Sequence, residues 1–425
     1  MSNSAYYEAA EPALTAARAA VARQVAAHGS WQISDLVDEA GQQYVDLVVE
    51  GGGVHGIALV GYVYVLEQLG VRFLRLGGTS AGAINAMLMA AAGPVATPKT
   101  DWLLAQLSAV DLQSFVDGDE DARDFIRTVL EKGGLLRYVW TGAQVLDNLR
   151  EDLGLNPGIV LHEWLRALLD ERGIRSLADL QRRRTLTVAD GLRYRDGTPY
   201  APAEPLRVAV VAADVTTESK VVFPEMADLY YIDPATVHPA DFVRASLSIP
   251  GFYWPYRIED LPRAGEPGGA DWLARTGYGG PVPASVLLAD GGILSNFPID
   301  LFHRHFRVPA CPTFGIKLGP DRTVPNHIEK FTHLVADVFS AARHGHDNDF
   351  ITHNPDYRHL VSYADTSRFN WLDFNLDEPT KLALFVAGAE AAARFVAAFD
   401  WASYKEVRRQ LIRAYQAADG ASAGA

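Results

Sequence analysis

The stretch that decides the fold runs from Val45 to Ala92 and reads VDLVVEGGGVHGIALVGYVYVLEQLGVRFLRLGGTSAGAINAMLMAAA. It contains two glycine-rich turns, GGGVHG at 51–56 and GTSAG at 78–82. Each turn follows a short apolar run with strand character and precedes an apolar run that is too long for a strand. Both turns are therefore predicted to be strand-to-helix corners.

The two corners predict strands at 46–50 and 71–77 and helices at 56–69 and 81–92. Consecutive strand–helix–strand units imply a parallel sheet with right-handed crossovers. The first strand is almost continuously apolar, as expected when helices cover both faces of a sheet. The predicted fold class is thus α/β, a mainly parallel sheet flanked by helices.

Composition excludes several classes of protein. The 425 residues carry 38 basic and 52 acidic side chains, for a net charge of −14, which argues against a nucleic-acid-binding protein. The single cysteine, Cys311, permits no intrachain disulfide and favours a reducing compartment. No signal peptide is recognisable, and no apolar segment reaches the roughly 20 residues of a membrane span. We expect a cytoplasmic protein that contacts membranes only peripherally.

Three regions are expected along the chain. Residues 1–44 form a helical extension with a helix at 11–28, residues 45–320 form the α/β domain, and residues 321–425 form a C-terminal helical segment packed on that domain. Helical periodicity without a convincing strand predicts a helical insertion at 94–184, after the second corner. Further strands are expected at 206–214, 220–224, 285–290 and 314–318, a hairpin at 185–199 with its turn at Asp196-Gly197, and helices at 242–249, 326–344, 379–399 and 402–418.

Ser80 is the candidate nucleophile because GTSAG matches the G-x-S-x-G pattern of a nucleophile elbow. At such a corner, Gly78 and Gly82 remove side chains that would collide with neighbouring backbone. The following helix directs its positive end toward the reacting centre. A serine hydroxyl also needs a base to take its proton and donors to stabilise the oxyanion.

The first turn is placed to supply those donors. Its three glycines leave backbone N–H groups exposed at a strand end, which suits an oxyanion hole. Gly51, Gly53 and Gly56 also match the dinucleotide pattern G-x-G-x-x-G, but that site requires an acidic residue at the end of the next strand. The next strand ends in the serine corner instead, so a nucleotide site is disfavoured.

Asp290 is the preferred base for Ser80. It ends a predicted core strand and precedes Gly291 and Gly292, which would let another backbone segment approach closely. Strand ends at one edge of a parallel sheet converge on the same cleft. The alternative is a catalytic triad that uses a downstream histidine from polar surroundings: His303, His305, His333 or His344.

The combination of GGGVHG, GTSAG and a distant DGG resembles the patatin-like phospholipases. The segments VRASLSIPGFYWP and VAADVTTESKVVF are similar to further motifs of that family, and the final FNLDEPTKLALFVAGAEAAARFV is similar to the C-terminal helix of its bacterial members. The resemblance covers about residues 45–318. It implies a Ser-Asp dyad of Ser80 and Asp290.

The resemblance further implies an oxyanion hole formed by backbone N–H groups of the turn made by Gly51, Gly52, Gly53, Val54, His55 and Gly56. The expected activity is that of a serine lipid acyl hydrolase of the phospholipase A or lysophospholipase type, acting through an acyl-serine on membrane or micellar lipid, without cofactor or metal. The alternatives are an acyltransferase or small-ester esterase on the same dyad, and a non-catalytic lipid-binding regulatory protein.

The sequence departs from the family at His55, where the family usually has Arg or Lys. We expect a titratable charge beside the oxyanion turn and activity that weakens as His55 loses its proton.

Two patterns that resemble metal sites have less to support them. Asp117, Asp119 and Asp121 imitate the start of a calcium loop but lack its later residues, and His344, His346 and Asp347 lack further ligands. The aromatic run at 252–256 suits either a lipid-contacting loop or core packing.

Overall fold

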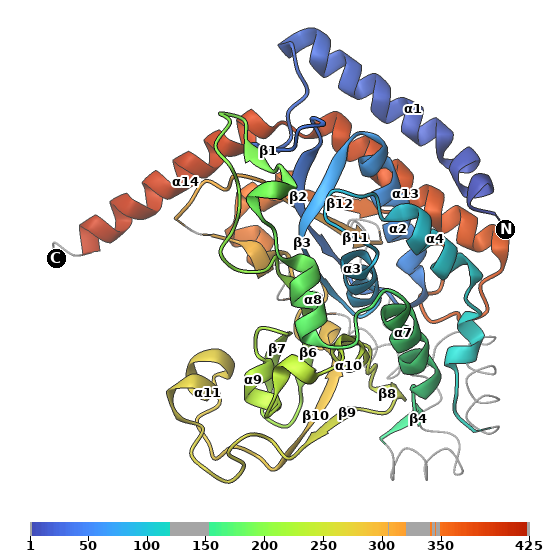
Figure 1. The fold of residues 1–425 in the computed structure, drawn as a ribbon, viewed down its shortest axis with the longest axis vertical. Coiled ribbons are helices and arrows are strands. Elements are labelled where there is room, and N and C mark those ends of the chain that lie inside the picture. Colours follow the sequence, from blue (N-terminus) through green and yellow to red (C-terminus); the bar gives the residue numbers. More distant parts are fainter. Residues whose placement is uncertain are drawn as a thin grey trace.

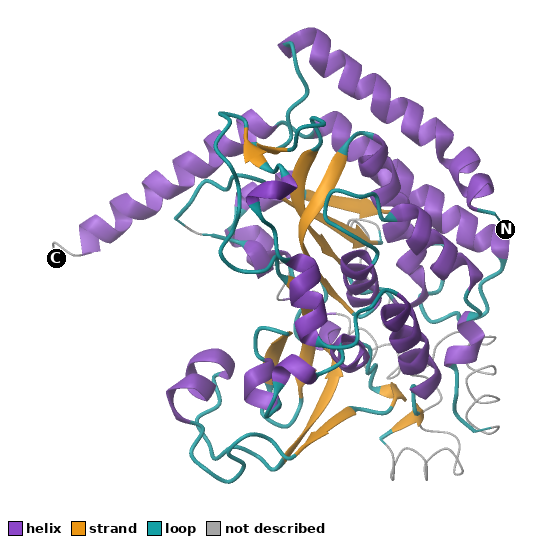
Figure 2. Cartoon of the chain, viewed as in Figure 1, coloured by secondary structure: helices purple, strands orange, loops and turns teal. Residues whose placement is uncertain are grey.

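The computed structural model describes residues 2–119, 153–304, 306–319, 341, 345 and 349–422. Strands and helices alternate through the first half of the chain, and the predicted α/β class is confirmed (Figures 1 and 2). The strands are β1 (Leu36–Val37), β2 (Gln43–Val49), β3 (Val71–Thr79), β4 (Gly154–Asn156), β5 (Arg193–Tyr194), β6 (Val208–Asp214), β7 (Ser219–Phe223), β8 (Gly251–Tyr253), β9 (Tyr256–Glu259), β10 (Ser285–Asp290), β11 (Thr313–Leu318) and β12 (Val361–Ala364).

The helices differ from the predicted ones mainly at their ends, apart from the short helices at 227–230 and 269–276, which were not predicted. They are α1 (Asn3–His28), α2 (Gly56–Gln68), α3 (Ala81–Ala91), α4 (Thr100–Ala109), α7 (Ile159–Glu171), α8 (Leu177–Arg184), α9 (Ala227–Tyr230), α10 (Pro239–Ser246), α11 (Gly269–Thr276), α13 (Glu378–Ala398) and α14 (Trp401–Ser422). The first helix begins well before the predicted residue 11 because it continues through Pro12. The helix expected at 326–344 lies largely outside the described residues.

The central sheet has the strand order β12-β11-β2-β3-β6-β10-β9. The strands from β12 to β6 are parallel, whereas β10 runs antiparallel to β6 and β9 antiparallel to β10. The strand β7 also pairs with β6 in antiparallel fashion, as expected for 220–224. The sheet is therefore mostly parallel, with an antiparallel extension beyond β6.

The helices cover the sheet in layers. α3 and α10 pack against β6, and α2 packs against β3. The long C-terminal helix α13 lies on α2, and α1 lies along α13 at the outside of the molecule (Figure 1). Apolar side chains from all of these elements form one core, in which the whole of β2 is buried. The core holds the carboxyl ends of β2 and β3 in place, and both predicted corners are at these ends.

The insertion at 94–184 is not purely helical in its described part. It contains α4, α7 and α8, but also the short strand β4, which pairs in parallel with β8. The expectation of no strand in this region was wrong because β4 has only three residues, too few to show periodicity. Its partner β8 belongs to the aromatic run at 252–256. Phe252 and Tyr253 are buried and pack in the core, whereas Trp254, Pro255 and Tyr256 are partly exposed.

Among the described residues, no single helix is long and apolar enough to cross a membrane. α13 and α14 pass that test only as a pair, and the two are bent by 71° relative to each other.

Candidate active site

Ser80 lies at the corner between β3 and α3, as predicted. Its backbone has φ 54° and ψ −124°, in a region that residues other than glycine rarely occupy. Such a conformation costs about 1–3 kcal/mol and persists only where the surroundings hold it. The residue is 1% exposed. The strained corner is therefore built into the core of the protein.

The glycines on either side of Ser80 explain how the corner is held. A Cβ atom on Gly82 would collide with the carbonyl oxygen of Val49, at the end of β2. A Cβ atom on Gly78 would lie 2.5 Å from the carbonyl oxygen of Gly82. Backbone from β2, β3 and α3 thus meets here with no room for a side chain.

Asp290 ends β10, which pairs with the same edge of β6 as β3 does, because β7 occupies the opposite edge over residues 210–214. Val211 of β6 pairs with Thr79, the residue before the serine, and Ala212 pairs with Asp290. The carboxyl ends of β3 and β10 therefore meet along one edge of β6. Both residues are buried, and Asp290 is 5% exposed.

The prediction of Asp290 rests on parallel strands, and the expected direction of its strand was wrong. β10 runs antiparallel to β6, so it points toward the carboxyl end of β3 instead of lying parallel to it. Asp290 reaches the level of the serine because β10 enters from beyond the carboxyl edge and pairs with only the last three residues of β6. The loop after it sits tightly on β6, since a Cβ atom on Gly291 would collide with the carbonyl of Val211.

The carboxylate of Asp290 has a defined hydrogen-bond partner. It accepts a hydrogen bond of 2.7 Å from the N–H of Gly292, and the N–H of Asp290 donates to the carbonyl of Ser248 at 2.8 Å. Both glycines of the DGG motif thus act through their backbone. Gly291 allows close approach to β6, and Gly292 donates a hydrogen bond to the carboxylate of Asp290.

Two serines near the end of α10 connect the Ser80 corner, β6 and Asp290 through hydrogen bonds. The sequence indicated no role for either serine. The hydroxyl of Ser246 accepts a hydrogen bond from the N–H of Ser80 at 2.9 Å and donates to the carbonyl of Val211 at 2.6 Å. Ser248 holds Asp290 through its carbonyl. The segment VRASLSIP was noted only for its resemblance to the family, and no local pattern indicates contacts with strands this distant in sequence.

The first glycine turn lies beside Ser80. A Cβ atom on Gly51 would be 3.0 Å from the Cβ of Ser80. Three N–H groups of the turn already donate to carbonyl oxygens: Gly51 to Asn296 at 3.0 Å, Val54 to Trp371 at 3.0 Å, and His55 to Gly52 at 3.1 Å. Gly53 has φ 53°, and a Cβ atom there would collide with the carbonyl of Trp371, so only glycine fits this position.

Glu50 and Asn296 hold this turn from outside it. The Asn296 amide donates to the carbonyl of Gly51 and to the carboxylate of Glu50, both at 3.1 Å. Glu50 is 1% exposed and also accepts from the N–H of Leu318. Sequence reasoning missed both residues. Glu50 did carry a signal, because it is an acid at the end of a buried apolar strand, as Asp290 is.

His55 is buried, and burial lowers its pKa to about 4, with a backbone hydrogen bond to Phe369 opposing that change in part. Its Nε2 atom has no hydrogen-bond partner among the described residues. The imidazole is therefore neutral across pH 5.5–8.5. The expectation of a titratable positive charge beside the oxyanion turn was wrong, because the ring lies in the protein interior and not at a solvated cleft.

The other sequence candidates lie elsewhere or outside the described residues. His303 hydrogen-bonds to the hydroxyl of Tyr357 at 2.6 Å, and Asp117 accepts from the N–H groups of Gly158 and Val160 at the start of α7. His305, His333, His344, His346, Asp121 and Asp347 fall outside the described ranges. Within the described residues, no three His, Cys, Asp or Glu side chains are grouped as metal ligands.

A mostly parallel α/β sheet with a serine at a strained strand-to-helix corner is the arrangement of serine hydrolases that have a nucleophile elbow. Residues 47–303, more than half of the chain, match the family model of the patatin-like phospholipases. The chain belongs to this family.

Its relatives include one bacterial protein of similar length. The chain is 29% identical to the uncharacterized protein YqhO of Bacillus subtilis over 357 residues, which cover 83% of this chain and 98% of YqhO. Among solved structures, VipD from Legionella pneumophila matches 86% of this chain and 70% of its own length, at 16% identity and a TM-score of 0.38. The ExoU chain in the ExoU–SpcU complex of Pseudomonas aeruginosa matches 88% of this chain and 59% of its own length, at 14% identity and a TM-score of 0.33.

Proposed function

We propose that the protein is a serine lipid acyl hydrolase of the phospholipase A or lysophospholipase type that uses Ser80 and Asp290 as its catalytic dyad. The single observation that carries this proposal is the strained, buried serine corner with a buried carboxylate at the end of β10, which meets the end of β3 along one edge of β6. Strain at a non-glycine residue marks functional sites when the surroundings maintain it. Membership in the patatin-like phospholipase family supports an acyl lipid as the substrate.

The proposed reaction has two steps. Asp290 accepts the proton of the Ser80 hydroxyl while the serine oxygen attacks the ester carbonyl, and the alcohol then leaves with a proton as the acyl-serine forms. A water molecule attacks the acyl-serine in the second step and releases the fatty acid. No cofactor takes part in either step.

The hydrogen bonds that the turn already makes reduce the number of N–H groups that are candidates for stabilising the oxyanion. We assign this role to the N–H groups of Gly52 and Gly53, because those of Gly51, Val54 and His55 already donate to carbonyl oxygens. The N-terminal end of α3 adds positive potential, since Ser80 is the residue that precedes its first turn. Preorganised donors of this kind typically contribute a factor of about 10²–10³ in kcat each.

The dyad is tested by incubating wild type, Ser80→Ala and Asp290→Asn with mixed phospholipid vesicles and measuring free fatty acid. We expect each substitution to reduce release by roughly 10³-fold or more. Asp300→Asn is the matched control, since Asp300 pairs with Lys220 away from the dyad and should leave release unchanged. Equal release by wild type and both dyad variants would refute the proposal.

An acyltransferase and a small-ester esterase use the same residues. Adding an acceptor alcohol separates transfer from hydrolysis, because transfer yields a new ester in place of free fatty acid. An esterase would cleave short esters and leave vesicle lipid intact. A non-catalytic lipid-binding protein would show no covalent labelling of Ser80 by a fluorophosphonate probe.

A further inference from the structure

A narrow apolar cavity begins beside the proposed catalytic residues. Gly53 and Gly56 of the first turn and Ala81, which follows Ser80, line one end of it. The volume is about 40 Å³, room for about three water-sized groups. The other lining residues are Val54, Ile57, Ile84, Asn85, Leu107, Leu112, Phe115, Trp164, Leu376 and Lys381.

The chemistry of this cavity suits a hydrocarbon chain. Nine of its thirteen lining residues are aliphatic or aromatic, so water gains few hydrogen bonds inside. The amide of Asn85 is already used, because it donates to the carbonyls of Gly56 and Ala81 at 3.2 and 3.1 Å. If the ester carbonyl is held at Gly53, its acyl chain is therefore directed into this narrow apolar cavity, which we call the slot.

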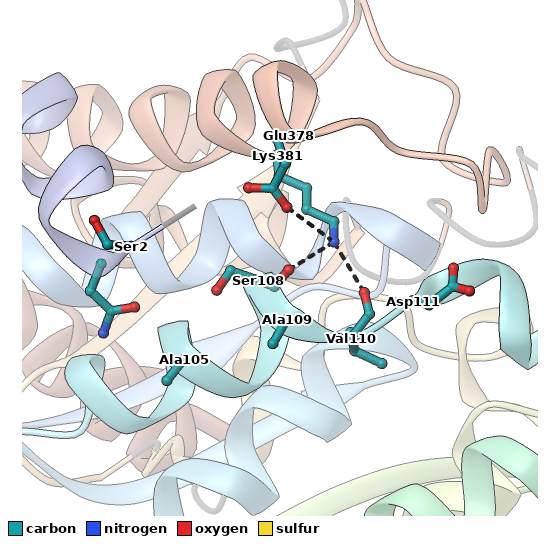
Figure 3. Close-up of a pocket in the computed structure, with 9 residues that line it drawn as sticks. Ser2, Ala105, Ser108, Ala109, Val110, Asp111, Glu378 and Lys381 are labelled. Atoms are coloured by element: carbon teal, nitrogen blue, oxygen red, sulfur yellow. Dashed lines mark hydrogen bonds and ion pairs between the residues drawn. The ribbon is translucent and has the colours of Figure 1, made fainter.

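Lys381 also lines this cavity. The residue is only 7% exposed, and its ammonium group donates to the carbonyls of Ser108 and Val110 at 2.9 and 3.0 Å and lies 4.0 Å from Glu378 (Figure 3). These contacts tie the start of α13 to the end of α4. The lysine is thus fixed in the wall by three neighbours.

Lys381 also borders a second and larger hollow. It opens at the surface between the start of α1, the end of α4 and the start of α13, has a volume of about 580 Å³, and is also lined by Lys381 (Figure 3). Lys381 is therefore a wall residue common to the narrow apolar cavity and to a space more than ten times larger.

We propose that the narrow cavity binds the acyl chain of the substrate and that Lys381 sets the maximum chain length. The inference rests on the proposed function and specifies which acyl esters that site takes. Short chains fit the slot in front of Lys381, and longer chains meet its fixed side chain. Shortening this residue joins the slot to the surface hollow and admits long chains.

The test compares rates of Ser80 labelling by butyl and dodecyl fluorophosphonates, in which the serine oxygen displaces fluoride at phosphorus. Wild type should react faster with the butyl probe. Lys381→Ala should raise the dodecyl-to-butyl rate ratio at least tenfold. Lys381→Met is the matched control: it also loses the ammonium group and its hydrogen bonds but keeps the length of the side chain, so the wild-type ratio should persist.

Leu112 also lines the cavity, and its half-exposed position allows a second test that does not depend on the buried lysine. Leu112→Trp should fill the slot and slow butyl labelling at least tenfold, while labelling by a methyl fluorophosphonate stays within twofold of wild type. Unchanged chain-length ratios in Lys381→Ala and Leu112→Trp would overturn the cavity assignment and leave the nucleophile intact. No labelling of wild type by any probe would instead refute the proposed function, and the acyl site with it.

Discussion

The two glycine turns look alike in sequence but are held in different ways. The serine turn at 78–82 is fixed by its own glycines, which pack backbone against backbone at the end of β2. The turn at 51–56 is fixed by side chains and carbonyls from Asn296 and Trp371, more than 200 residues away. The nucleophile corner is thus held mainly by backbone packing, with one hydrogen bond from the Ser80 N–H to Ser246, whereas the oxyanion turn is held by hydrogen bonds to residues distant in sequence.

The largest effect should come from filling the local corner. Gly82→Ala places a methyl group against the carbonyls of Val49 and Glu50, neither of which belongs to a flexible side chain. We expect a loss of at least about 3 kcal/mol in the free energy of unfolding, at the upper end of overpacking costs, and loss of Ser80 labelling. Denaturant unfolding and fluorophosphonate labelling measure the two effects.

Gly279→Ala is the control for that experiment, because a Cβ atom there would make only an ordinary contact of 3.7 Å with Leu273. It should leave stability and labelling within error of wild type. Retention of full labelling by Gly82→Ala would show that the corner is more tolerant than its packing indicates.

Loss of the distant support should have a smaller and more specific effect. Asn296→Ala removes the donor to the Gly51 carbonyl and to Glu50, so the oxyanion turn loosens while the serine corner stays intact. We expect kcat on a short ester to fall roughly 10–100-fold, below the cost of deleting an oxyanion donor outright. The change in KM should be small.

The matched control is Asn354→Ala, since Asn354 also donates its amide to a backbone carbonyl, that of Phe350 at 2.9 Å, but away from the site. Each variant should lose about 1 kcal/mol of stability. If both variants lowered kcat equally, the specific role of Asn296 in the oxyanion turn would be disproved.

The smallest effect at neutral pH concerns His55. Its pKa is lowered to about 4, so the unfolded state takes up a proton below pH 6.5 before the folded state does. Stability linked to this residue is therefore complete above pH 6.5 and decreases as the pH falls toward 4, by about 3 kcal/mol in total.

Unfolding of wild type and His55→Gln at pH 7 and pH 4.5 measures this contribution as the difference between the two pH dependences. The wild type should lose more stability on acidification than the variant does. Identical pH dependences would show that the imidazole is not buried as a neutral group. Across pH 5.5–8.5, no change in activity should trace to protonation of His55.

The contrast between the turns also explains what could be predicted from the sequence. Apolar runs and glycines are local signals for both corners, for the buried strand β2 and for the end of β10 at Asp290. The structure contains all of these elements, so these expectations were confirmed. The antiparallel direction of β10 and the short strand β4 have no such signal, because pairing direction and three-residue strands depend on tertiary contacts. Ser246, Asn296 and the burial of His55 were missed for the same reason.

The central claim is that Asp290 activates Ser80, and the most direct test is the site and rate of covalent labelling. Wild type and Asp290→Asn are treated with a butyl fluorophosphonate, and the adduct is located by peptide mass spectrometry. We expect one adduct, on Ser80, that forms at least about 10³-fold more slowly in Asp290→Asn although the variant folds normally. An adduct on another residue, or equal labelling rates in the two proteins, would contradict it.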